Sequence, residues 1–283
     1  MSAIGLHLLT ESVSSPRLRP MTVHPEHPLG LQFREFTALG GGPRVGLGLG
    51  GRPLDAWTLA TELADPASEQ LERSLRRVGV NVKSADRLVM MSLFFGSYVW
   101  QVASAAIGCY LLTQRVPDIS AENVAVHIGD DGRVDEIRLL GGGFAALPAD
   151  PAADHHEAVI VPDLTALRET LVRQLTDGHL EELILTLQNR RGLGTRALWA
   201  EVEDRTVGAL LWLGKRLDSR LDIEAEALAL SRTPPFVGTS GVQVTETSGS
   251  RELALKRGFC CLSYRLDGKS ACQTCPLRCR EQT

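Results

Sequence analysis

The chain has 283 residues, of which 43% are hydrophobic, so it is long enough for one large globular domain or two smaller ones. Its formal net charge of −4 argues against wholesale nucleic-acid binding. Residues 1–20 lack a basic start and Glu11 interrupts their apolar run, so we expect no secretory signal and a reducing, cytoplasmic location.

The glycine-rich start of the chain predicts largely irregular structure over residues 1–52. Within it, Gly46, Gly48 and Gly51 match the G-x-G-x-x-G pattern of nucleotide-binding loops. That pattern binds a dinucleotide when it follows a buried strand and opens a helix, and here Pro53 comes soon after it. We therefore expect a loop and no nicotinamide or flavin site.

Two helices are predicted next. The first covers residues 55–64. The second would have Asp65 as its N-cap and Pro66 at its first position, and would end near Gly79. Its inward face would carry Leu71, Leu75 and Val78.

Residues 88–114 contain no charged side chain, which raises the question of a membrane span, because about 20 apolar residues cross a bilayer. Small and polar residues nevertheless recur along one face: Ser92, Gly96, Ser97, Gln101, Ser104 and Gly108. Such a face lets another helix approach closely, so we predict a buried core helix and no membrane span. Cys109, among apolar neighbours, is expected to behave as a small buried hydrophobic residue.

The clearest strand signal is a hairpin, with strands over 124–128 and 134–140 around a tight turn. The polar run Asp154-His155-His156-Glu157 could suggest a metal site. Because its histidines are adjacent rather than four apart on a helix, we expect them to be solvated instead.

From residue 163 onward, leucines recur at helical spacing. The pattern predicts helices on either side of Gly178, a long helix capped by Thr195, and a further helix over about 221–230 that ends before Pro234-Pro235. An extended stretch over 236–246 and a short helix before the last cysteines would follow. The expected fold class is helix-rich α+β: a helical body with a small β-hairpin or sheet element and a short carboxyl-terminal segment.

Five of the six cysteines gather at the end of the chain: Cys260, Cys261, Cys272, Cys275 and Cys279. In a reducing compartment such clustering favours metal ligation over disulfides. Cys272-x-x-Cys275 is a common chelating half-site, whereas adjacent cysteine side chains diverge and converge poorly on one small ion. A [2Fe–2S] cluster takes four thiolates on two irons, so it is favoured over Cys₄ zinc, with disulfides third.

The Cys-Cys-x10-Cys-x2-Cys arrangement resembles the signature of FhuF-type ferric siderophore reductases. The flanking residues agree, reading Phe259-Cys260-Cys261-Leu262-Ser263-Tyr264-Arg265 and Cys272-Gln273-Thr274-Cys275-Pro276-Leu277-Arg278. Upstream, Arg196-Ala197-Leu198-Trp199-Ala200-Glu201-Val202 is similar to a helix of these reductases and of related siderophore synthetases. Glu201 stands where that pattern often has Asn, so no role is carried to it.

The resemblance implies a [2Fe–2S] cluster on Cys260, Cys261, Cys272 and Cys275, with Cys279 as a spectator. The division would be a reductase-like body over 1–246 and a cluster-binding segment over 247–283. The implied activity is one-electron reduction of a bound Fe(III)–siderophore, which frees Fe(II) for the cell. The implied partners are the ferric siderophore and an external electron donor such as a ferredoxin or a reduced nicotinamide system, and no catalytic residue is expected beyond the cluster.

Two other functions stay open at this point: a zinc-stabilised Cys₄ binding or regulatory module, and an iron–sulfur electron shuttle or redox sensor without a chelate substrate. The charge distribution bears on the site, since residues 250–283 hold seven basic and three acidic residues, leaving −8 for the rest. Cations here would offset the negative charge of a cluster or attract an acidic donor or an anionic chelate, or be ordinary surface charges. The candidates are Arg257, Arg265, Lys269 and Arg278.

Overall fold

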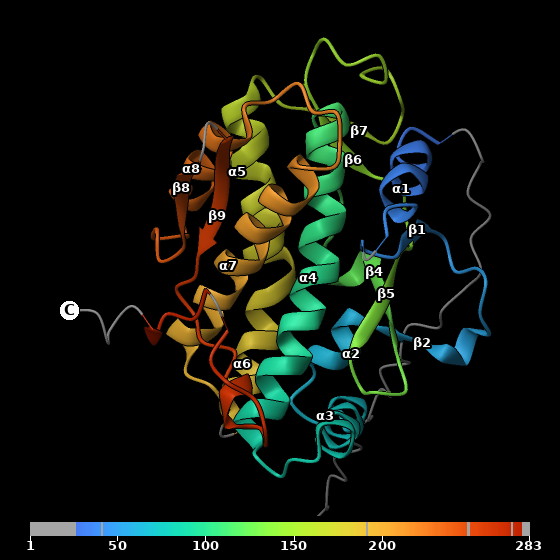
Figure 1. Cartoon of the computed structure of the whole chain (residues 1–283). Coiled ribbons are helices and arrows are strands. Elements are labelled where there is room, and N and C mark those ends of the chain that lie inside the picture. The colour runs from blue at the N-terminus through green and yellow to red at the C-terminus, as the bar shows by residue number, and fades with distance from the viewer. Residues whose placement is uncertain (1–26, 41, 191, 248–249, 273, 279–283) are drawn as a thin grey trace, which may run out of the picture.

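The computed structural model describes residues 27–40, 42–190, 192–247, 250–272 and 274–278 (Figure 1). Its helices are α1 (Gly30–Thr37), α2 (Ala60–Ala64), α3 (Glu69–Val82), α4 (Arg87–Thr113), α5 (Leu164–Leu175), α6 (Glu181–Asn189), α7 (Thr195–Gly214) and α8 (Ile223–Ser231). Short helical turns are η1 (Leu54–Ala56), η2 (Ala121–Asn123), η3 (Thr176–Leu180) and η4 (Ser263–Arg265). The strands are β1 (Val45–Leu47), β2 (Trp57–Leu59), β3 (Arg115–Pro117), β4 (Val124–Ile128), β5 (Val134–Leu139), β6 (Phe144–Ala146), β7 (Ala158–Ile160), β8 (Gly241–Thr247) and β9 (Ser250–Lys256). The helix-rich α+β class is confirmed.

Helix α4 is the central element, and it packs against α7 on one side and against strand β5 on the other (Figure 1). The small residues on its surface let α7 and α1 pack closely against it. A Cβ atom on Gly96 would lie 2.6 Å from the Glu201 carboxylate of α7, and one on Gly108 would lie 2.7 Å from the Phe36 ring. The helix has the length and composition of a membrane span, yet 72% of its most apolar window is buried inside the protein. The predicted buried core helix, with Cys109 fully buried in it, is confirmed.

Helix α3 begins later and ends later than predicted. Ser68 is the N-cap, and its hydroxyl accepts a hydrogen bond from the Leu71 N–H at 3.2 Å. Asp65 instead closes the preceding turn by accepting from the Ala67 N–H at 2.7 Å. The helix runs through Gly79, which lies against Met90 of α4, and ends at Lys83 in the left-handed conformation. Its inward face is as predicted, with Leu71, Leu75 and Val78 buried.

The amino-terminal part of the body is more regular than expected. Irregular structure was predicted over residues 1–52. Residues 1–26 lie outside the described residues, and α1 and β1 form in the remainder. Where a helix was predicted over 55–64, only its last five residues are α-helical, and Trp57–Leu59 form a strand that pairs with β4. The reason is packing, because Trp57 and Leu59 share a small apolar cluster with Ala125.

The strands make three small sheets. The first has the order β1-β5-β4-β2, with β1 and β5 parallel and the other pairs antiparallel. It contains the predicted β4–β5 hairpin, whose turn is closed by the Gly129 N–H donating to the Arg133 carbonyl at 2.8 Å. The second has the order β3-β6-β7, and the third is the β8–β9 hairpin.

Two further elements differ from the prediction. Gly178 does not separate α5 from α6; it lies in the π-helical turn η3, which joins them. The segment before the cysteines is the strand β9 rather than a short helix. Leu253 and Leu255 of β9 pack against the core and so does Val242 of β8, and this alternation is that of a hairpin with one inward face.

Candidate functional site

Two of the four candidate cysteines meet in the structure. The sulfur atoms of Cys260 and Cys275 lie 3.8 Å apart, and Cys275 is buried. Tetrahedral coordination with metal–sulfur bonds of about 2.3 Å separates two ligand sulfurs by about 3.8 Å. The pair therefore fits two ligands of one metal ion.

The other two candidate thiols have different surroundings. The Cys261 sulfur lies 3.2 Å from the Ser263 hydroxyl oxygen, and Cys272 is exposed. The cysteines within the described ranges are free thiols, whereas Cys279 lies outside those ranges.

Local backbone conformation positions these sulfurs. Leu262 is in the left-handed region at φ 57° and leads into the turn η4. That conformation directs the Leu262 N–H to the Cys260 sulfur and the Ser263 N–H to the Cys261 sulfur. The Cys272-x-x-Cys275 loop is closed by the Cys275 N–H, which donates to the Cys272 carbonyl at 3.1 Å. N–H groups that donate to cysteine sulfurs stabilise the thiolates and influence the reduction potential of a cluster bound by those thiolates.

The two neighbouring thiols differ in acidity. Burial, together with the adjacent Cys275 and Cys261 thiols, raises the pKa of Cys260 to about 11, against the lowering effect of the Leu262 N–H. Burial also acts to raise the pKa of Cys261. The hydrogen bonds from Ser263 and the positive charge of Arg257 outweigh it, so the pKa of Cys261 falls below its usual 9.0. Cys261 is thus the easier of the two to convert to the thiolate that binds metal.

A buried carboxylate of α7 fixes the start of the cysteine segment. Asp204, almost fully buried, accepts hydrogen bonds from the N–H groups of Gly258 at 2.8 Å and Phe259 at 2.9 Å. The Arg257 guanidinium lies 3.3 Å from the same carboxylate. The Asp204 carboxylate and the Arg257 guanidinium are both largely removed from water, so each would be a destabilising unpaired charge without the other. The pair therefore holds the cysteine segment in one place on α7.

Two more buried acids extend this network. Glu201 forms ion pairs with Arg257 at 2.9 Å and with Arg205 at 2.7 Å. Burial raises the pKa of Glu201, against the lowering effect of the two arginines. Glu203 accepts from the N–H and hydroxyl of Thr239 and from the Ser240 N–H. We call Glu201, Glu203 and Asp204 the α7 carboxylates.

Sequence reasoning assigned no role to the α7 carboxylates. A signal was present, because acidic residues at 201, 203 and 204 stand between the apolar residues Leu198 and Val207 of a predicted helix. Charged side chains at such positions are almost never buried unless they are paired. Apart from Arg205, four residues after Glu201, their partners named above lie 36 to 56 residues away along the chain.

Of the four candidate basic residues, two form ion pairs and two do not within the described part of the chain. Arg257 is mostly buried and belongs to the carboxylate network. Arg265 pairs with Asp86, the N-cap of α4, at 2.8 Å. Lys269 and Arg278 are exposed and make no ion pair with a residue that the structure describes. A further contact ties the segment to α4, since the Ser92 hydroxyl donates to the Cys261 carbonyl at 3.0 Å.

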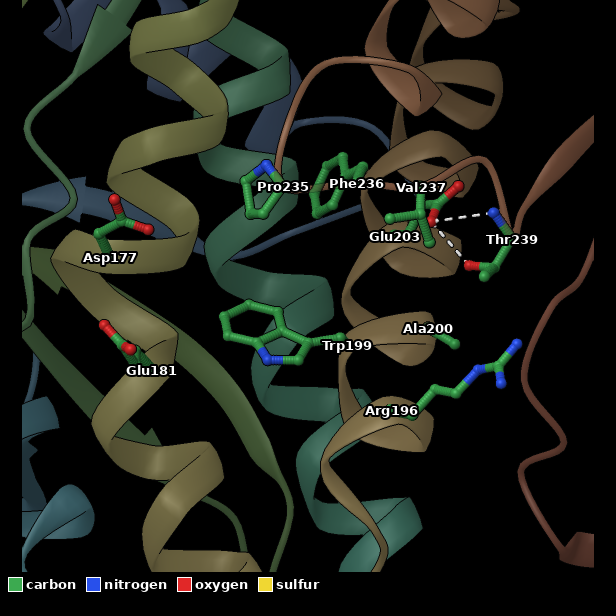
Figure 2. Close-up of a pocket in the computed structure, with 10 residues that line it drawn as sticks. All are labelled: Asp177, Glu181, Arg196, Trp199, Ala200, Glu203, Pro235, Phe236, Val237 and Thr239. Atoms are coloured by element: carbon green, nitrogen blue, oxygen red, sulfur yellow. Dashed lines mark hydrogen bonds between the residues drawn. The ribbon is translucent and has the colours of Figure 1, made fainter.

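A cavity of about 400 Å³ opens on the other side of the α7 carboxylates. It is lined by Asp177, Glu181, Arg196, Trp199, Ala200, Glu203, Pro235, Phe236, Val237 and Thr239. Figure 2 shows Trp199 in its middle, with Asp177 and Glu181 on one side and Arg196 on the other.

The run Asp154-His155-His156-Glu157 was predicted to be solvated, and only part of it is: His155 and Glu157 are half-buried. His27 is buried, and its Nε2 lies 2.9 Å from the Glu157 carboxylate, with His155 beside them. The three could hold a metal by proximity alone. However, the Leu29 N–H donates to Nδ1 of His27, so Nε2 of the neutral ring carries the proton that it donates to Glu157. A histidine binds a metal through one ring nitrogen while the other donates a hydrogen bond, but both nitrogens of His27 are already used, by the Leu29 N–H and by Glu157. This group therefore acts as a hydrogen-bonded link between distant loops.

Comparison with known proteins places these features in a family. The family model described as "Ferric iron reductase FhuF-like transporter" matches residues 92–240, and the one described as "FhuF 2Fe-2S C-terminal domain" matches residues 257–277. No curated protein sequence gives a significant match.

Similar solved structures include two of the aerobactin synthetase IucA from a hypervirulent pathotype of Klebsiella pneumoniae. The ATP-bound form is 12% identical over 62% of this chain and 31% of that one, with a TM-score of 0.45. The other is 13% identical over 67% of this chain and 39% of that one, with a TM-score of 0.47. The matched part of the chain therefore spans 31% to 39% of the synthetase length.

Proposed function

The chain belongs to the family of FhuF-like ferric iron reductases and carries a [2Fe–2S] carboxyl-terminal domain, and from this premise we propose that it is a ferric siderophore reductase. The reaction is the transfer of one electron to the Fe(III) of a bound siderophore, followed by release of Fe(II). Siderophores hold iron through hard oxygen donors, which bind the less charged Fe(II) more weakly, so reduction frees the metal.

We infer that Cys260, Cys261, Cys272 and Cys275 hold the cluster. The observation that carries this assignment is the 3.8 Å separation of the Cys260 and Cys275 sulfurs on a segment anchored to the helical body. When bound, a [2Fe–2S] cluster supplies one-electron transfer between an external donor and the ferric chelate.

The chain's own residues then have three tasks. The cysteines bind, and the N–H groups of Leu262 and Ser263 stabilise the thiolate charge. Arg257 adds a fixed positive charge beside Cys261, which favours the reduced, more negative state of the site. Glu201 and Asp204 hold Arg257 and the segment against α7, so the site keeps its place when an electron arrives.

The decisive experiment uses the anaerobically purified full chain, reduced and freed of excess reductant, to which ferric siderophores are added. We expect reoxidation that depends on the chelate, with one Fe(II) trapped by a ferrous chelator per electron. An electron shuttle or redox sensor would stay reduced in the presence of every chelate. A zinc module would be colourless and would contain stoichiometric zinc without acid-labile sulfide. The proposal includes an external electron donor, such as a ferredoxin or a reduced nicotinamide system, and a cytoplasmic location.

A further inference from the structure

We propose that the cavity between η3, the start of α7 and the loop from Pro235 to Thr239 is where the ferric chelate docks, a proposal that rests on the proposed function. Its volume of about 400 Å³ lies within the range of small-molecule sites, about 300–1,000 Å³. Three residues of the 196–202 segment, Arg196, Trp199 and Ala200, line it.

The first argument is the apolar surface. Trp199 is only half-buried although it lies in the middle of the cavity, and the Val237 side chain is 80% exposed at its edge (Figure 2). Pro235 is exposed beside it, over the buried ring of Phe236. Apolar side chains left open to water around a concave site are typical of ligand pockets. A chelate that encloses its metal in an organic shell presents a matching surface.

The second argument is charge. Three carboxylates and one guanidinium line the cavity, which gives a formal charge of −2. Asp177 and Glu181 are exposed on one wall, and neither forms an ion pair within the described part of the chain. The π-helical turn η3 carries Asp177 to this position, and such turns are frequent at functional sites. A chelate without net negative charge is therefore favoured over one with three negative charges.

The third argument is the short route to the cysteines. Glu203 lines the cavity and holds Thr239, while the next residue of α7, Asp204, holds the backbone of Gly258 and Phe259. A Cβ atom on Gly258 would lie 2.7 Å from the Thr239 carbonyl oxygen, so the cavity loop and the start of the cysteine segment are in direct contact. Cys260 follows two residues later, at most about 7 Å along the chain. A chelate in the cavity is separated from the thiols by little more than one layer of protein.

The test measures binding without electron transfer, by replacing Fe(III) with Ga(III), which has the same charge and is not reduced. Isothermal titration calorimetry would give the dissociation constants of the cluster-containing full chain for an uncharged gallium tris-hydroxamate and for a gallium tris-catecholate of charge −3. We expect Trp199→Ala to weaken binding of the uncharged complex at least tenfold. Trp212→Ala, a half-buried tryptophan of the same helix outside the cavity, should change it less than twofold.

Charge selection is tested separately with the double variant Asp177→Asn/Glu181→Gln. It should tighten binding of the −3 complex at least tenfold and leave the uncharged complex within threefold. The visible spectrum of the cluster verifies that each variant is folded.

The outcomes separate the two proposals. If the wild-type chain reduces ferric chelates but Trp199→Ala binds the gallium complexes as well as wild type does, the cavity assignment is wrong and the reductase function stands. If the wild-type chain neither binds a gallium complex nor is reoxidised by a ferric one, the proposed function fails and the cavity assignment fails with it.

Discussion

At the scale of single residues, the ligand set gives the sharpest prediction. Cys272→Ser should abolish the visible chromophore and the acid-labile sulfide, because a [2Fe–2S] cluster on the four proposed ligands has no replacement for a missing thiolate. Cys279→Ser should retain both. Iron and sulfide counts on anaerobically purified protein measure this, and loss of the chromophore in Cys279→Ser would show that the ligand set is wrong.

Asp204 is the residue whose loss should release the cysteine segment. Asp204→Ala leaves the Gly258 and Phe259 N–H groups and Arg257 without their buried acceptor, which costs about 3–5 kcal/mol. We expect a lower thermal midpoint and incomplete cluster incorporation. Asp218→Ala, at an exposed acid just beyond the end of the same helix, is the matched control and should behave as wild type. Full cluster content and an unchanged midpoint in Asp204→Ala would contradict the anchoring role.

The sequence alone suggested the four thiols as ligands, but not the contacts that hold their segment in place. Spacing is a local property, so Cys260, Cys261, Cys272 and Cys275 could be recognised directly. The role of Asp204 depends on backbone N–H groups more than 50 residues away, and no local pattern announces that contact. The cavity was equally invisible, because η3, α7 and the loop before β8 come together only in the folded chain.

At the scale of elements, Glu72 connects α3 to the start of α4 and to the residue after α6. Its carboxylate accepts two hydrogen bonds from Arg87 and lies 2.7 Å from Arg190. The Arg87 hydrogen bonds and the Arg190 contact outweigh burial and lower the pKa of Glu72 below 4.5. Because the carboxyl pKa of Glu72 is lower in the folded state, its ion pairs stabilise the fold above pH 4.5, and this stabilisation is lost as the pH falls further.

Glu72→Gln should therefore be less stable than wild type at pH 7 by about 1 kcal/mol, a thermal shift of about 2 °C. The difference should shrink as the pH falls below 4.5, where wild-type Glu72 is also neutral. Far-ultraviolet circular dichroism melts of both proteins at each pH measure it. Acid loss of the cluster affects both equally, so a difference that stays constant with pH would refute the assignment.

The elements themselves were predictable in proportion to their length. The long apolar face of α4 fixed that helix within a residue at either end. Short elements were decided by partners instead: Trp57–Leu59 became a strand because β4 offered an edge, and residues 250–256 became β9 because β8 lay alongside. Gly178 looked like a break, yet the turn η3 absorbs it without ending the helical path.

At the scale of the whole molecule, charge is separated between the body and the cysteine segment. Residues 250–283 carry a formal charge of +4 and the remainder −8. Two cations of this segment, Lys269 and Arg278, are exposed and lie three residues before Cys272 and three residues after Cys275 in the sequence, whereas Arg257 is paired with buried carboxylates. A positive rim on a negative molecule orients an acidic partner toward the site.

This orientation predicts how an acidic electron-donor protein behaves. Its rate of reducing the chain should fall as salt rises from 0.01 to 0.1 M, since the screening length shortens from about 30 to about 10 Å. Lys269→Glu/Arg278→Glu should lower the rate at low salt at least tenfold and flatten its salt dependence, while Arg220→Glu/Arg232→Glu, at exposed arginines outside the segment, should not. Stopped-flow absorbance measures both rates, and reduction by a small uncharged reductant should be the same in all variants. A donor rate that is indifferent to the Lys269 and Arg278 reversal would place the donor on another face.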